Sequence, residues 1–95
     1  MNSVNASHIL VKTEAEALDI LHKIVSKEIS FEDGARKYSS CPSKAKGGIL
    51  GTFGKGMMVA EFEEACFNEK NKSGDIVGPV KTDFGFHLIR INSLE

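Results

Sequence analysis

The alternation of apolar and polar residues at the two ends of the chain predicts two β-strands. Residues 6–11 are rich in apolar and β-branched side chains, and His8 and Leu10 within them share one face. Residues 86–92 alternate in the same way. One face of this second segment carries His87, Ile89 and Ile91, and the other carries Phe86, Leu88 and Arg90. Each segment therefore places one histidine on a predicted strand.

Helical spacing of apolar residues predicts three helices between these strands. The first begins after Thr13, which with Glu16 fits a capping box, and extends to about Lys27. Its apolar stripe is predicted to consist of Ala17, Leu18, Leu21, Ile24 and Val25. The second follows a Ser30 cap and ends before a loop over 39–48. The third is predicted over 59–68, with Phe62, Ala65 and Cys66 at helical spacing.

Two further strands complete the predicted order. Residues 49–53 form a short one, and residues 76–81 form another that Gly78-Pro79 interrupts. The order is β-α-α-β-α-β-β, and a short turn joins the last two strands. This order predicts an α+β fold, in which helices surround a four-stranded, mostly antiparallel sheet. With 95 residues, we expect a single domain over 1–95.

The charge balance excludes partners that need a strong electrostatic field. The formal net charge is −1, so neither nucleic acid nor an acidic membrane is an expected partner, and we expect a monomer. A basic run lies between Asp33 and Glu61. It is either a solvated loop or a device that favours acidic residues in a substrate. Its members are Arg36, Lys37, Lys44, Lys46 and Lys55.

The chain start and the cysteines indicate a cytoplasmic protein. Residues 1–5 have neither a cationic start nor an apolar run, so no signal peptide is expected there. Nowhere does an apolar stretch approach the length of a transmembrane helix. Cys41 and Cys66 show no disulfide-framework pattern, which fits a reducing compartment.

The spacing of the glycine, histidine and cysteine residues disfavours a nucleotide-binding loop and a zinc site. The glycines between 47 and 56 match neither the P-loop nor the dinucleotide fingerprint. No His or Cys pair has zinc-ligand spacing, so no metal site is expected. A nucleophilic pair of Cys41 with His8 or His87 stays open, although the short chain leaves little room for an oxyanion hole and a cleft.

Four ordered segments resemble the parvulin family of peptidyl-prolyl cis/trans isomerases. They span most of the chain from Ala6 to Asn92 and, taken together, are specific. The resemblance implies a four-stranded antiparallel sheet surrounded by helices, which agrees with the order predicted from periodicity. The segments are 6–12 (ASHILVK), 40–53 (SCPSKAKGGILGTF), 56–65 (GMMVAEFEEA) and 77–89 (VGPVKTDFGFHLI).

The resemblance also implies a function and a set of site residues. The function is rotation of X-Pro bonds in peptides and in unfolded or folding proteins, with no covalent step and no cofactor. The polar centre would comprise His8, Cys41, Thr82 and His87. The proline pocket would comprise Leu50, Met58 and Phe62, with Phe53 supporting it.

Departures from the family pattern refine this expectation. Relatives often have proline at the position of Glu61 and aspartate at that of Ile49, and neither change touches the proposed centre. The basic insertion of phospho-directed members is missing after the first strand, as is a WW domain, so strict phospho-specificity is not expected. The alternative function is a binding module that holds proline-containing segments without turnover.

Overall fold

The computed structural model describes residues 2–95, so the expectations for Met1 lie outside the described residues. The predicted order of strands and helices is confirmed, and one short 3-10 helix, η1, is added to it. The bounds are β1 (Ser3–Val11), α1 (Glu14–Val25), α2 (Phe31–Tyr38), η1 (Pro42–Lys46), β2 (Ile49–Gly54), α3 (Ala60–Cys66), β3 (Ile76–Thr82) and β4 (Gly85–Leu94).

The four strands form one sheet in the order β2-β1-β4-β3. All three neighbouring pairs are antiparallel. The first and last strands of the sequence are therefore the two central strands of the sheet. In their register, Leu10 is opposite His87 and His8 is opposite Ile89. This pairing brings the two histidines, which lie 79 residues apart in the sequence, onto adjacent strands.

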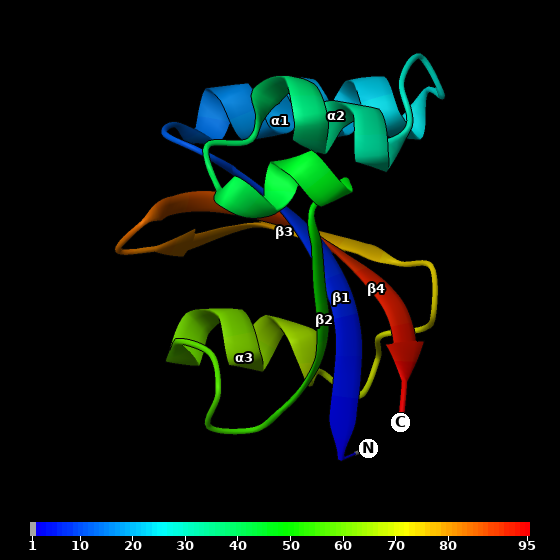
Figure 1. Cartoon of the computed structure of the whole chain (residues 1–95), viewed down its shortest axis with the longest axis vertical. Helices are drawn as coiled ribbons and strands as arrows, with labels where there is room; N and C mark the ends of the chain where they lie inside the picture. Colours follow the sequence, from blue (N-terminus) through cyan, green and yellow to red (C-terminus); the bar gives the residue numbers. More distant parts are fainter. Residues whose placement is uncertain (1) are drawn as a thin grey trace.

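Helices cover both faces of the sheet and divide the core into two parts (Figure 1). Helices α1 and α2 lie over one face, where Ile9, Val11 and Leu88 pack beneath them. Helix α3 lies over the other face, on which Val4, Ala6 and Ile89 are buried. Alternation along β1 and β4 thus assigns successive residues to opposite cores, as the sequence pattern predicts. Among residues 2–95, no helix combines the length and apolar character needed to cross a membrane.

The apolar face of α1 differs from the predicted stripe at three positions. Leu18 is 49% exposed and Val25 is 68% exposed, whereas Ile20, which the predicted stripe left out, is 3% exposed. The helix packs through positions 17, 20, 21 and 24, a regular i, i+3, i+4, i+7 face. Leu18 and Val25 lie just outside this face, so the prediction that they are core residues was wrong.

Helix caps follow the predicted signals, while several boundaries shift. The Thr13 hydroxyl accepts from the Glu16 amide at 3.2 Å, and the Ser30 hydroxyl accepts from the Asp33 amide at 3.1 Å. Strand β1 begins at Ser3 rather than Ala6, because β2 and β4 supply pairing partners over that stretch. Helix α1 ends at Val25, two residues before Lys27, which has a positive φ of 66°.

The predicted loop over 39–48 contains η1 and is held tightly against β1. Gly48 has a φ of 89°, and a Cβ there would lie 2.5 Å from the His8 carbonyl oxygen, so only glycine fits without displacement. The His8 amide in turn donates to the Gly48 carbonyl at 2.9 Å. On the other side, the Ser40 amide donates to the Leu10 carbonyl at 2.8 Å. Cys41, between these two anchors, is thereby held beside β1.

Candidate active site

A hydrogen-bonded chain of three buried side chains links the central strands to the end of β3. Nδ1 of His8 lies 3.0 Å from Nδ1 of His87, and Nε2 of His87 lies 2.7 Å from the Thr82 hydroxyl oxygen. The two imidazole rings are stacked, with a centroid separation of 5.2 Å. All three residues are at most 6% exposed. The structure thus brings together three of the four polar residues that the sequence singled out.

The Thr82 hydroxyl stands at one end of this chain. It accepts from the Phe84 amide at 3.2 Å and lies 2.7 Å from His87 Nε2, to which it can donate its own proton. In that tautomer His87 carries its proton on Nδ1 and donates to Nδ1 of His8. Nε2 of His8 is a buried atom with no hydrogen-bond partner among residues 2–95.

Burial keeps both rings neutral near pH 7. Desolvation, reinforced by the neighbouring His87, lowers the pKa of His8 from 6.5 to about 4. Desolvation also lowers the pKa of His87. The pair is therefore a neutral polar group in an apolar setting and not a source of positive charge.

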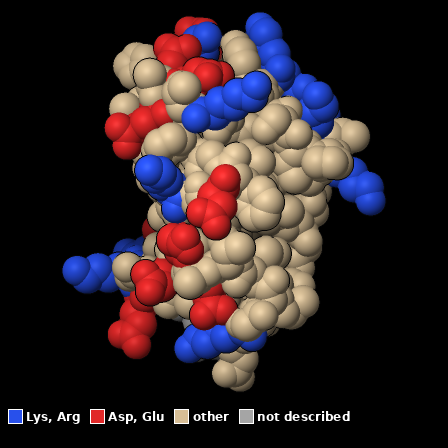
Figure 2. All heavy atoms as spheres, turned by 90° about the vertical axis from the view of Figure 1, so that its left-hand side faces the viewer, with Lys and Arg blue, Asp and Glu red and all other residues tan. Residues whose placement is uncertain are grey.

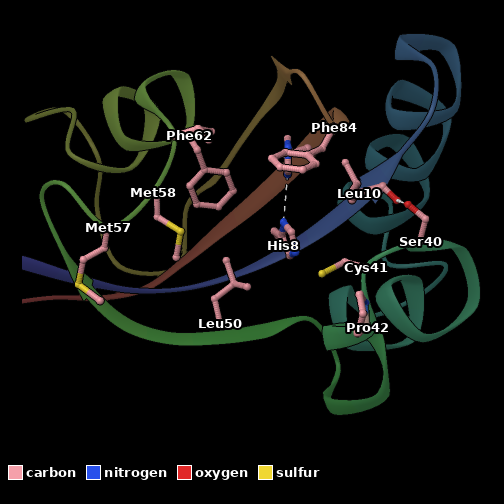
Figure 3. Close-up of a pocket in the computed structure, with 12 residues that line it drawn as sticks. His8, Leu10, Ser40, Cys41, Pro42, Leu50, Met57, Met58, Phe62 and Phe84 are labelled. Atoms are coloured by element: carbon pink, nitrogen blue, oxygen red, sulfur yellow. Dashed lines mark hydrogen bonds between the residues drawn. The ribbon is translucent and has the colours of Figure 1, made fainter.

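An open cavity of about 430 Å³ lies against His8 and His87 (Figure 3). Leu50, Met58 and Phe62 form its apolar end, and in the figure their side chains lie on one side of His8. The Phe62 ring meets both imidazoles edge-on, at centroid distances of 5.8 Å and 5.2 Å. These three residues are the predicted proline pocket, and the structure places them together in one cavity wall.

Phe53 lies behind the cavity and does not form part of its wall. It is 3% exposed, and its ring centroid is 6.1 Å from that of Phe62. Phe62 itself is 2% exposed and belongs to the core on the α3 side of the sheet. Phe53 therefore supports the position of Phe62, which agrees with its expected supporting role.

Cys41 lines the cavity but stands outside the hydrogen-bonded chain. Its thiol accepts from the Ser43 hydroxyl at 3.3 Å, and no hydrogen bond joins it to His8 or His87 in the described residues. The expectation that Cys41 completes the polar chain is not met in this geometry. The missing contact also weakens the alternative of a Cys-His nucleophile, because that chemistry needs the base within hydrogen-bond reach of the thiol.

Cys66 has a different environment and takes no part in the site. It is fully buried beside Phe62 in the core, and burial raises the pKa of its thiol to about 12. Within residues 2–95, no group of three His, Cys, Asp or Glu side chains is arranged to hold a metal ion.

The cavity is also lined by six residues that the sequence-based site did not include. They are Leu10, Ser40, Pro42, Met57, Val59 and Phe84. The signal for Leu10 was present, because it shares the face of His8. The signal for Phe84 was an aromatic residue in a tight turn between two predicted strands, where its side chain has no core in which to pack. Its side chain is 69% exposed.

Comparison with known proteins gives one consistent family. Residues 6–93 match the Rotamase family, described as a PPIC-type PPIase domain. The foldase protein PrsA of Geobacillus kaustophilus is 46% identical over 93 residues, which are 97% of this chain and 32% of that protein. The chain therefore spans about a third of the length of this foldase.

Solved structures agree with the sequence comparison. A crystal structure of the peptidylprolyl isomerase PrsA from Bacillus anthracis superposes with a TM-score of 0.89 at 42% identity, covering 97% of this chain and 42% of the other. The solution structure of NmPin, the parvulin of Nitrosopumilus maritimus, gives a TM-score of 0.84 at 40% identity and covers 98% of both chains.

Proposed function

This chain belongs to the PPIC-type peptidyl-prolyl isomerase family, the parvulins, and we propose that it rotates X-Pro bonds in the cavity beside His8 and His87. The unit that carries this activity is the single domain matched over residues 6–93. The main support is the position of the apolar Leu50, Met58 and Phe62 wall directly beside a neutral, buried imidazole pair.

Rotation about a peptide C–N bond requires loss of its partial double-bond character, against a barrier of about 18–20 kcal/mol. Cis and trans X-Pro bonds differ by only about 0.5–1 kcal/mol, so no net driving force is needed. No covalent bond forms or breaks, and no cofactor is required. The protein needs only to bind the twisted amide more tightly than either planar form.

The cavity supplies two devices for this purpose. The apolar wall holds the proline ring and removes water from the carbonyl of X, whose hydrogen bonds to water favour the planar form. In the twisted amide the proline nitrogen regains its lone pair and becomes a better acceptor. When His8 carries its proton on Nε2, this otherwise unpartnered N–H is the donor that serves the proline nitrogen of the twisted amide.

The roles of the individual site residues follow from their contacts. His87 and Thr82 orient His8, because the chain of hydrogen bonds holds the His8 ring in position. Cys41 contributes a wall of the cavity and a polar contact rather than a nucleophile. Leu50, Met58 and Phe62 form the proline pocket, with Phe53 behind them.

The proposed substrates are proline-containing peptides and unfolded or folding proteins, without strict phospho-specificity. The name foldase, carried by the PrsA relatives, supports action on folding proteins. For this chain we further propose a monomer without nucleic-acid or membrane partners and a cytoplasmic location, which the two free thiols support. Cell fractionation is the test of this location.

Catalysed refolding tests this function on a protein substrate. A protein whose slow refolding phase is limited by proline isomerisation is refolded with a hundredth of an equivalent of this chain. Since the uncatalysed step takes about 10–100 s at 25 °C, acceleration is easily resolved. A phase that shortens in proportion to the enzyme concentration supports the isomerase. A phase that is unchanged or slowed indicates a binding module instead.

A further inference from the structure

The edge of β1 that faces away from β4 changes its partner beside His8. Strand β2 pairs with β1 only as far as Ser7. Beyond this point the loop over 39–48 lies along the edge, and the His8 amide donates to the Gly48 carbonyl at 2.9 Å. Two residues further along, the Leu10 amide is bound by a side chain instead of a backbone carbonyl. The end of β1 that carries the site is therefore positioned by a loop and not by a neighbouring strand.

The side chain that binds Leu10 is the Ser39 hydroxyl, which accepts from two amides at once. Its Oγ lies 3.0 Å from the Leu10 amide nitrogen and 3.3 Å from the Cys41 amide nitrogen. A hydroxyl oxygen has two lone pairs, so both hydrogen bonds can form together. Ser39 is only 3% exposed, so its oxygen is a buried acceptor and not a surface hydroxyl. One atom thus joins β1 to the loop at a single point.

The backbone of Ser39 is itself held in place by α2. Its amide donates to the Ala35 carbonyl at 3.1 Å, which continues the hydrogen bonding of the helix by one residue. Ala35 is fully buried and belongs to the same core as Ile9 of β1. The hydroxyl therefore projects from a packed helix end, and its position does not depend on the mobility of a free loop.

The two amides that Ser39 binds belong to two different walls of the cavity. Leu10 and His8 line it from β1, and Cys41 lines it from the loop. Figure 3 shows the Cys41 side chain directed towards His8. A shift of either amide would change the separation of these walls. The fit of a peptide bond beside His8 therefore depends on an oxygen that lies behind the cavity.

Hydrogen bonds rather than ion pairs hold these walls together. Within residues 2–95, ion pairs lie inside α1, inside α2 and between α2 and β4, and none involves the loop over 39–48. The described residues that line the cavity include no Lys, Arg, Asp or Glu. Figure 2 shows a broad uncharged area on the corresponding face of the molecule. Loss of the Ser39 acceptor is thus not compensated by a charged contact.

We propose that Ser39 is a positioning residue for the isomerase reaction, whose hydroxyl sets the separation of Cys41 from His8 by binding the amides of Cys41 and Leu10. The proposal rests on the proposed isomerase function. Ser39 does not line the cavity, so it acts through the two walls and touches no substrate. Because the proline pocket lies elsewhere in the wall, Ser39 governs the rate of rotation more than the affinity for the peptide.

The test removes the hydroxyl in Ser39→Ala and measures exchange of a Leu-Pro peptide at several peptide concentrations. We expect kcat to fall about tenfold, because small displacements of a reacting site have effects of this order. The dissociation constant, from an NMR shift titration, should change less than about threefold. Hydrogen exchange of the Leu10 and Cys41 amides should accelerate at least about tenfold more than that of Ile9, which is paired with β4.

Ser30→Ala is the matched control at the other end of α2. The Ser30 hydroxyl accepts from the Asp33 amide at 3.1 Å, and Ser30 is not among the residues that line the cavity. This variant also loses an amide hydrogen bond of a serine and should be less stable. The kcat of its folded form should equal that of the wild type. Unfolding curves identify a temperature at which both variants are folded, and all rates are measured there.

Four results separate the role of Ser39 from a general effect on stability and from the function itself. A wild-type kcat in folded Ser39→Ala overturns the role of Ser39, as does an equal loss of kcat in Ser30→Ala. Equally accelerated hydrogen exchange at Leu10, Cys41 and Ile9 also overturns it, because that pattern indicates only a less stable protein. Wild-type protein that leaves peptide exchange unchanged overturns the isomerase function.

Discussion

Nδ1 of His8 and Nδ1 of His87 are 3.0 Å apart, so the two rings share one proton between them. If both rings were imidazolium, each would present an N–H to the other and no acceptor would remain. The arrangement therefore requires at least one neutral ring, and burial of both makes the doubly neutral form the stable one. Several properties of the protein follow from this single contact.

Stability should fall on mild acidification because of this pair. Below pH 6.5 the unfolded chain binds a proton at His8, whereas the folded chain, with a His8 pKa of about 4, does not. The free energy of unfolding is therefore constant above pH 6.5 and decreases from there towards pH 4. His8 alone contributes a loss of about 2 kcal/mol by pH 5, and the lowered pKa of His87 adds in the same direction.

Denaturant unfolding between pH 5 and 7.5 measures this loss of stability. Most Asp and Glu side chains titrate below this pH range, so they contribute little to the change. His22→Gln, which removes an exposed histidine on α1, is the matched control variant. A stability that does not change between pH 6.5 and pH 5 in the wild type contradicts the neutral pair.

Thr82→Val should destabilise the protein and release His87 from its fixed orientation. The hydroxyl contacts both His87 Nε2 and the Phe84 amide, and valine fills the same volume without either hydrogen bond. We expect a loss of about 1–3 kcal/mol in unfolding free energy and a shift of the His87 ring ¹⁵N resonances. Thr82→Ser keeps the hydroxyl and should restore the resonances. If serine fails to restore them, the hydroxyl does not orient the ring.

Cys41→Asp should retain substantial isomerase activity. Among residues 2–95 the thiol is bound only by the Ser43 hydroxyl and is not joined to either histidine, so its contribution is polar rather than nucleophilic. Peptide exchange kinetics and intact-protein mass spectrometry, run on the same samples, provide the check. Loss of turnover in the variant, together with a covalent peptide adduct on wild-type Cys41, would falsify this account.

Comparison of Met58→Ala with Cys66→Ala should distinguish a residue that binds substrate from one that only stabilises the fold. Met58 is half-buried in the cavity wall, so its truncation is expected to lower kcat/KM about tenfold or more with little loss of stability. Cys66 is buried in the core and does not itself line the cavity, so its truncation should lower stability and affect kcat/KM less. Similar losses of activity in both variants count against the proline pocket.

Phe62→Ala is a less selective version of the same test. Phe62 is buried in the core as well as lining the cavity, and its ring packs on both histidines. We expect activity to fall, together with a loss of about 3–5 kcal/mol in unfolding free energy. Activity must therefore be measured at a temperature where calorimetry shows the variant to be folded.

The order of elements was predictable because its signals are local, whereas the three central polar residues came from the resemblance to parvulins. Two-residue alternation assigned His8 and His87 to strands, and capping residues marked the starts of α1 and α2. Their meeting in space follows from the pairing of β1 with β4, which periodicity does not specify. The resemblance to parvulins implied one polar centre that contains both histidines, and the structure supplies the strand pairing that brings them together.

The features of the fold and the site that the sequence did not predict depend on tertiary contacts, which no local pattern reveals. Leu18 and Ile20 both fit an amphipathic helix, and only the packing of α1 on the sheet buries one and exposes the other. The η1 helix depends on the Gly48 backbone approaching His8. The position of Cys41 outside the polar chain depends on the same loop. Leu10 and Phe84 become neighbours only when the β3–β4 turn folds back over β1.

The most direct test of the central claim is two-dimensional exchange NMR of a Leu-Pro peptide at equilibrium. The peptide is held in large excess, and wild-type protein is added at about one per cent of its concentration. The account predicts that cis and trans resonances exchange faster in proportion to added protein, while their populations stay the same. Shifted or broadened peptide resonances with an unchanged exchange rate would show that the cavity only binds proline, and would contradict it.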